Sequence, residues 1–310
     1  MRAFVFPGQG AQTIGMGKPL AAAYPAAQAV FDEVDDALGE KLSALIWEGD
    51  IAELTLTQNA QPALMATSMA VMRALQTEGV DVSAASFVAG HSLGEYSALA
   101  AAGALSIADT ARLLRLRGQA MQEAVPVGVG AMAAVLGLDF DAVASIAVDA
   151  AQADVCAAAN DNDPGQVVVS GHKAAVERAI EIAKERGAKR AILLPVSAPF
   201  HCSLMAPAAQ IMADALDKVD INPPSVPVIS NVLAGPVSDP AQIRSLLIDQ
   251  ITGSVRWRES VGFMAAAGVT DFFEIGAGKA LSGMVKRVDR SLTAHAVGAP
   301  DDVKTAVANL

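Results

Sequence analysis

The segment from Gly90 to Gly94, which reads GHSLG, constrains the fold more than any other part of this chain. This G-x-S-x-G pattern lies between a short apolar run, Ser86 to Ala89, and a helix-like run from Glu95 to Ala102. A strand, a tight turn, a serine and a helix in this order are typical of a nucleophile elbow. We expect the glycines to permit the strained turn, and the first helical N–H groups to face a developing oxyanion. The segment therefore predicts a serine nucleophile, Ser92, on an α/β fold.

Composition narrows the class of protein. Hydrophobic residues make up 53% of the 310 residues, which is ample for a large core. A formal net charge of -11 argues against nucleic acid as a partner, because phosphate binding needs a basic surface. No apolar run is long enough for a membrane span, so we expect no membrane association. Two cysteines form no disulfide framework, which favours the cytoplasm. We also expect no metal site.

The first and last parts of the chain show strand and helix patterns in alternation. A buried strand is expected at Phe4 to Phe6, followed by a Gly-rich loop, and helices at about Ala21 to Leu38 and Gln61 to Thr77. Further strands are expected at Val226 to Ser230 and Phe272 to Ile275. This order predicts a mostly parallel sheet with helices on its faces, in a hydrolase-like large domain.

A second pattern begins after Pro126. Its predicted order is β-α-β-β-α-β, the ferredoxin-like arrangement, with a turn at Asn160 to Gly165 between the middle strands. We therefore predict a discontinuous large domain, residues 1–126 and 198–310, with a small domain inserted at 127–197. The expected elements are strands at Gly130–Gly137, Asp154–Ala159, Gln166–Ser170 and Arg190–Val196, and helices at Phe140–Ala151 and His172–Arg186.

Arg117 lies on an apolar helix face. A capping box from Ser106 to Asp109 begins this helix, and Arg117 shares a face with Leu113, Leu114 and Met121 at i, i+3, i+4 spacing. A buried arginine needs an anion. The sequence pattern alone leaves two possibilities open, a carboxylate of the protein or a ligand.

A serine nucleophile needs a base, and the chain has four histidines. His91 adjoins Ser92, but its side chain is expected to point away from the serine across the turn, and His172 is expected near a helix cap. An ordinary α/β-hydrolase places its histidine late, which would favour His295 with an acid such as Asp271. His201, however, lies in a Pro-Phe-His loop at a domain junction, where clefts form. Spacing favours His201 only mildly.

Six motifs in one chain, in this order, carry a family resemblance over almost the whole sequence. The motifs are Phe6–Gly10, Gly90–Tyr96, Arg117-Gly118, Gln166–Gly171, Pro199–Cys202 and Glu274–Lys279. Together they closely resemble the malonyl-CoA:acyl carrier protein transacylase family, the acyltransferases of fatty acid synthesis.

The resemblance implies a function and roles for individual residues. Ser92 would carry the malonyl group from coenzyme A to the phosphopantetheine thiol of holo acyl carrier protein, with His201 as the base. The N–H of Leu93 and the backbone at Gln9 would form the oxyanion hole. Arg117 would hold the malonyl carboxylate. The remaining implied residues are Gln250, which would orient His201 through its main-chain carbonyl, Asn160 and Asn162 beside the cleft, and Phe200, which would crowd an α-methyl group.

The resemblance also implies partners. We expect a monomer that needs no cofactor beyond its two substrates. We also expect it to form a transient complex with the acidic carrier protein. Because this chain is acidic too, docking would need a local basic patch, with Lys189, Arg190, Lys286 and Arg287 as candidates. Two alternatives remain, a serine thioesterase or esterase using His295, and a non-catalytic protein that binds the carrier.

Overall fold

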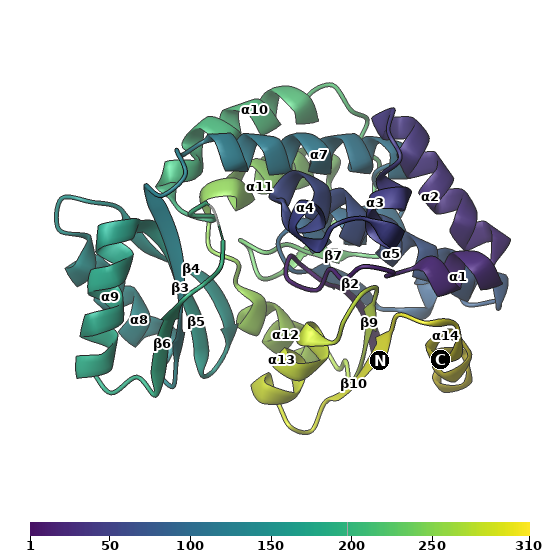
Figure 1. Cartoon of the computed structure of the whole chain (residues 1–310). Coiled ribbons are helices and arrows are strands. Elements are labelled where there is room, and N and C mark those ends of the chain that lie inside the picture. The colour runs from purple at the N-terminus through teal and green to yellow at the C-terminus, as the bar shows by residue number, and fades with distance from the viewer. Residues whose placement is uncertain (197) are drawn as a thin grey trace.

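The computed structural model describes residues 1–196 and 198–310. Ser197, the last residue of the predicted small domain, lies outside the described residues. Two lobes stand side by side (Figure 1). The large lobe contains a six-stranded sheet, and the small lobe, residues 130–193, contains a separate four-stranded antiparallel sheet. This matches the predicted combination of a mostly parallel α/β unit with a second, smaller unit.

The sheet of the large lobe has the strand order β10-β9-β1-β2-β7-β8. Its first five strands run parallel, and β8 pairs antiparallel with β7. Both faces are covered, as expected for a parallel sheet. Alternate residues of β1 divide between two cores, since Phe4 and Phe6 face one and Ala3 and Val5 the other. The strands are β1 (Arg2–Phe6), β2 (Phe87–Gly90), β7 (Val228–Ile229), β8 (Pro236–Val237), β9 (Asp271–Ile275) and β10 (Thr293–Val297).

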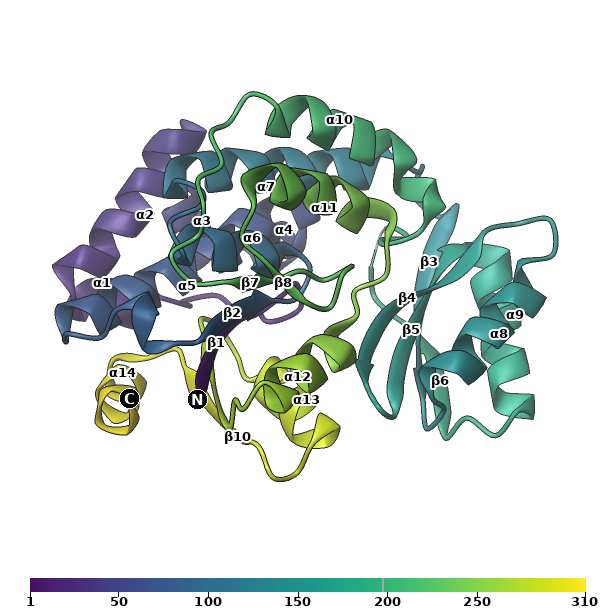
Figure 2. The ribbon, with the colours of Figure 1, turned by 180° about the vertical axis from the view of Figure 1, so that it is seen from behind.

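Most helices of the large lobe cover one face of this sheet, and α12 and α13 cover the other (Figure 2). No helix in the described part of the chain is long and apolar enough to cross a membrane. The helices are α1 (Lys18–Ala23), α2 (Pro25–Leu38), α3 (Leu42–Glu48), α4 (Ile51–Thr55), α5 (Thr57–Thr77), η1 (Val82–Ala84), α6 (Leu93–Ala101), α7 (Ile107–Glu123), η2 (Ser203–Met205), α10 (Ala206–Leu216), α11 (Pro240–Thr252), α12 (Trp257–Ala266), α13 (Ala280–Val288) and α14 (Pro300–Asn309).

The small lobe follows the predicted β-α-β-β-α-β order, with the sheet order β4-β5-β3-β6. Two helices, α8 and α9, pack on one face of this sheet around a core of Ala, Val and Ile side chains. The elements are β3 (Gly130–Leu136), α8 (Phe140–Ala151), β4 (Cys156–Asp163), β5 (Gln166–His172), α9 (Lys173–Glu185) and β6 (Arg190–Leu193).

Several sequence predictions about these elements were wrong. The strand expected at Arg190–Val196 ends at Leu193, and the one expected at Val226–Ser230 comprises only Val228–Ile229. The single helix expected from Ala21 to Leu38 is two helices, because Tyr24 is extended and Pro25 begins α2. The turn expected from Asn160 to Gly165 is shorter, since β4 continues to Asp163. Asn and Asp are uncommon in strands, but here they continue β4 because β5 pairs with it as far as Asp163 and Val255 of the large lobe pairs with its other edge at Asn160.

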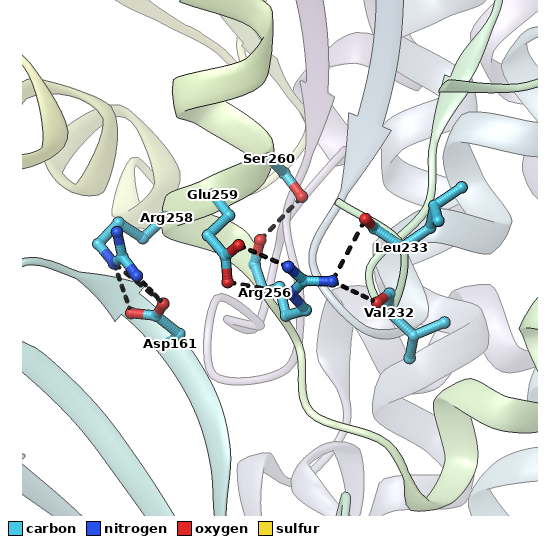
Figure 3. Close-up of polar contacts among 7 residues, drawn as sticks. All are labelled: Asp161, Val232, Leu233, Arg256, Arg258, Glu259 and Ser260. Carbon is cyan, nitrogen blue, oxygen red and sulfur yellow. Dashed lines mark hydrogen bonds and ion pairs between the residues drawn. The ribbon is translucent and has the colours of Figure 1, made fainter. Parts of the chain in front are cut away.

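Backbone and ion pairs join the two lobes at β4. The Asp161 N–H donates to the Val255 carbonyl, and the buried Asp161 carboxylate pairs with Arg258 of α12 at 2.8 Å (Figure 3). Asp163 pairs in the same way with Arg287 of α13 at 2.7 Å. Beside these pairs, Arg256 donates to Glu259 and to the carbonyls of residues 232 and 233 (Figure 3). The junction fixes β4, and with it Asn160 and Asn162, against Val255, α12 and α13 of the large lobe.

Candidate active site

The predicted elbow is present at the carboxyl end of β2, but its glycines act differently from our expectation. Gly90 and Gly94 do not have positive φ; a Cβ on Gly90 would lie 1.9 Å from the Gly94 backbone, and one on Gly94 would lie 2.3 Å from the Phe6 carbonyl. The glycines therefore allow close packing, and the strained residue is Ser92 itself, with φ 55° and ψ -110°. Such a conformation costs about 1–3 kcal/mol and is typical of functional sites.

His201 is the histidine that the structure brings to Ser92. Its Nε2 lies 2.8 Å from Ser92 Oγ, and its Nδ1 lies 2.9 Å from the Gln250 main-chain carbonyl. Because a carbonyl only accepts, Nδ1 carries the proton and Nε2 offers its lone pair to the serine. Burial, followed by the charge of Arg117, lowers the pKa of His201 to about 3, so the ring is neutral and can take a proton at pH 7.

Arg117 is buried at the centre of the site, as the helical periodicity predicts. It is 1% exposed, and Gly118 beside it lets α7 approach the α5 backbone closely. Arg117 donates to Gln61 Oε1 at 2.8 Å, to Gln250 Oε1 at 2.8 Å and to Ser92 Oγ at 3.1 Å. These three partners are uncharged. The sequence left two possible partners for Arg117, a carboxylate of the protein or a ligand. This geometry favours an anionic ligand.

Gln250 and Asn231 hold the elbow from the side of α11 and β7. The Asn231 side chain accepts from the Ser92 N–H at 2.7 Å and donates to the Gly90 carbonyl at 2.7 Å. Gln250 Nε2 donates to the Ser92 carbonyl at 3.0 Å and to Glu95 Oε2 at 2.7 Å. Polar groups of this strained turn are thus satisfied by two buried amides.

A cavity of about 430 Å³ opens onto Ser92 between the lobes. The predicted residues Gln9, Leu93, Asn160 and Phe200 line it, together with Ser92, His201 and Arg117. Other lining residues include Met121, Met132, Leu194, Pro195 and Val196, so much of the wall is apolar. Among the described residues that line this cavity, His295 is absent.

The remaining predicted residues have other surroundings. Asn162 holds His91, since its Oδ1 lies 2.8 Å from His91 Nε2. His295 lies on the edge strand β10 and stacks on Phe273, with ring centroids 4.8 Å apart. Of the four candidate docking cations, all are exposed, and Arg287 is engaged by Asp163.

Sequence reasoning missed three buried polar residues of the site, Gln61, Glu95 and Asn231. Asn231 follows a predicted strand directly, and ligand-binding residues gather at the carboxyl ends of parallel strands, so this signal was available. Gln61 and Glu95 lie within helices, and only the fold brings Gln61 to Arg117 or Glu95 to Gln250.

Comparisons with known proteins agree over nearly the full length. Residues 3–306 match a family model described as an acyl transferase domain. A malonyl CoA-acyl carrier protein transacylase of Bacillus subtilis is 52% identical, covering 99% of this chain and 96% of that protein. The crystal structure of an acyl-carrier-protein-S-malonyltransferase from Bartonella henselae has a TM-score of 0.97 at 55% identity, covering 99% of this chain and 98% of that one.

A third relative was solved with a partner. It is a malonyl-transacylase in complex with a type II PKS acyl-carrier protein in its holo form. Its TM-score is 0.97 at 44% identity, and the match covers 100% of this chain and 99% of that one. With the family model and the identities above, this chain belongs to the acyl transferase family and, within it, to the malonyl CoA-acyl carrier protein transacylases.

Proposed function

We propose that this protein transfers the malonyl group from malonyl-CoA to the phosphopantetheine thiol of holo acyl carrier protein, supplying fatty acid synthesis. One observation carries the proposal: Ser92 Oγ lies within hydrogen-bond distance of both His201 Nε2 and the Arg117 guanidinium. A nucleophile, a base and a cation for a carboxylate thus meet at one point. The curated relatives carry the name of this activity, and one solved relative holds an acyl carrier protein.

The reaction proceeds in two halves through an ester on Ser92. Ser92 Oγ attacks the thioester carbonyl while His201 Nε2 takes its proton. The C–O bond forms, the C–S bond breaks, and the coenzyme A thiol leaves with that proton. The carrier thiol then gives its proton to His201 and attacks the ester, and Ser92 recovers the proton as it leaves.

The oxyanion of each tetrahedral intermediate is assigned to two backbone groups. Leu93 is the first residue of α6, and N–H groups of a first helical turn lack partners within their helix. Gln9 lines the same cavity from the loop after β1, and we assign its backbone as the second group. Gln250 orients His201 through its carbonyl, with no acid in the triad position.

Arg117 supplies selectivity for the acyl group. Malonyl differs from acetyl by one carboxylate, and a guanidinium fork binds a carboxylate in two-point fashion. Phe200 and Asn160 line the cavity, and Asn162 supports His91 at its edge. We assign Phe200 to exclusion of an α-methyl group.

The hydrolase alternative is less favoured. It needs His295 as base, and His295 packs on Phe273 while His201 contacts the serine. The non-catalytic alternative leaves the assembled Ser92, His201 and Arg117 unexplained.

Further parts of the proposal concern organisation and location. The large domain is hydrolase-like and comprises residues 1–126 and 198–310, with a ferredoxin-like small domain at 127–197; the chain order and the two sheets support this division. The protein acts as a monomer in the cytoplasm without a cofactor. Two free cysteines support a reducing compartment.

Intact-mass measurement after mixing with malonyl-CoA tests the ester directly. The wild-type protein should gain one malonyl group, and Ser92→Ala should gain none. Ser97→Ala is the matched control, because Ser97 is a buried serine of the same helix with no part in the cavity, and it should acylate normally. An adduct that persists in Ser92→Ala would refute the assignment.

Replacing Arg117 should change acyl preference. Removing one partner of a buried charge pair costs about 3 kcal/mol or more, roughly a hundredfold. Arg117→Ala should therefore lose malonyl transfer by about that factor and keep or gain acetyl transfer. Arg115→Ala on the same helix removes an arginine that pairs with Glu40, and it should leave the preference unchanged. Unchanged malonyl transfer in Arg117→Ala would make Arg117 a structural residue.

Charge reversal tests carrier docking. Lys286 is exposed on α13, whereas Arg287 beside it also joins the lobes, so Lys286→Glu is the cleaner change. It should raise the KM for carrier protein without changing the KM for malonyl-CoA. The variants Arg287→Glu, Lys189→Glu and Arg190→Glu test the other three candidate residues in the same way. Lys304→Glu on α14 is the control. Equal effects on both KM values would exclude docking at Lys286.

A further inference from the structure

Glu95 is a buried carboxylate that the mechanism above does not use. It lies in the first turn of α6, three residues after the nucleophile, and is 2% exposed. Its Oε2 accepts the Asn231 N–H at 3.1 Å and Gln250 Nε2 at 2.7 Å. Burying a carboxylate destabilises the fold unless hydrogen bonds or an opposite charge offset its desolvation free energy.

The carboxylate determines which end of the Gln250 side chain faces Arg117. Gln250 Nε2 has three acceptors around it, Glu95 Oε2, the Ser92 carbonyl and, at 3.4 Å, Asn231 Oδ1. Its Oε1 accepts from Arg117 at 2.8 Å. A flipped amide would turn an oxygen toward three acceptors and an NH₂ toward a guanidinium, so the observed orientation is strongly preferred.

In this arrangement Arg117 donates only to uncharged groups, and its Nε–H has no hydrogen-bond partner among the described residues. A carboxylate in direct contact with Arg117 would occupy the donors that a ligand carboxylate needs. Here the Glu95 carboxylate is separated from Arg117 by the Gln250 amide. It therefore attracts the buried guanidinium and orients it through Gln250 without a direct hydrogen bond to it.

We propose that Glu95 is a positioning residue for acyl selectivity, which fixes the Gln250 amide and through it the aim of Arg117 at the carboxylate of the acyl group. The inference rests on the proposed function, because it concerns the same carboxylate-binding step. Glu95 touches neither the substrate nor the reacting atoms.

Titration of Glu95 adds an independent signature. Burial raises the pKa of Glu95 to about 7, although hydrogen bonds from Asn231, Gln250 and Ser230 and the charge of Arg117 act in the opposite direction. The charged and titratable side chains coupled to Glu95 are Arg117 of α7 and Tyr96 of α6. The ionised form is therefore present above about pH 7 and is lost as the pH falls. His201 does not titrate in that range, since its pKa is about 3.

The experiment compares kcat/KM for malonyl-CoA and acetyl-CoA in Glu95→Gln, with holo carrier protein as acceptor. Glutamine has the same shape and keeps an acceptor but lacks the charge. We expect malonyl transfer to fall about tenfold through KM, the difference between a charged and a neutral hydrogen bond, and acetyl transfer to stay within about twofold. The rate of malonyl transfer by the wild-type protein should decrease as the pH is lowered below about 7. Glu95→Gln should not show this decrease.

Glu274→Gln is the matched control. Glu274 is a fully buried carboxylate that accepts from the N–H groups of Leu281 and Ser282, away from the cavity. Its loss should lower the Tm without changing the ratio of malonyl to acetyl transfer. An unchanged ratio in Glu95→Gln, or the same change in Glu274→Gln, would overturn the inference. Failure of the wild-type protein to form the malonyl ester would instead overturn the proposed function.

Discussion

The buried charge of Arg117 is the interaction on which the rest of the site depends. A guanidinium that is 1% exposed and has uncharged partners remains costly until an anion reaches it. Gln61 and Gln250 each accept one hydrogen bond from it, and Glu95 balances its charge from one amide away. Burial, followed by the same charge, lowers the pKa of His201, so the imidazole is neutral at pH 7.

The backbone around the nucleophile is packed so closely that its two neighbouring glycines have no room for a side chain. Gly90 and Gly94 press against neighbouring backbone, and the resulting turn places Ser92 at positive φ. The buried amide of Asn231 bonds to both ends of this turn. The elbow is strained, but its surroundings fix it, which places Oγ between the base and the cation before a substrate arrives.

Much of this could be predicted from local patterns. Period-3.6 spacing placed Arg117 inward, and the strand-turn-helix context located Ser92. Residues that act through contacts made only by the fold could not be found, such as Glu95 and Gln61, because their helical positions look like ordinary core or surface. The predicted extent of β4 was wrong for the same reason, because Val255, which pairs with Asn160 of β4, lies far along the chain. Choosing His201 over His295 needed the family resemblance, since spacing alone left both open.

The most direct measurement is calorimetric binding to Ser92→Ala, which cannot be acylated at this position. If the buried guanidinium awaits a carboxylate, this variant should bind malonyl-CoA at least about tenfold more tightly than acetyl-CoA. The two ligands differ by that carboxylate alone, so coenzyme A contacts cancel in the comparison. Equal affinities would contradict the view that Arg117 recognises the acyl group.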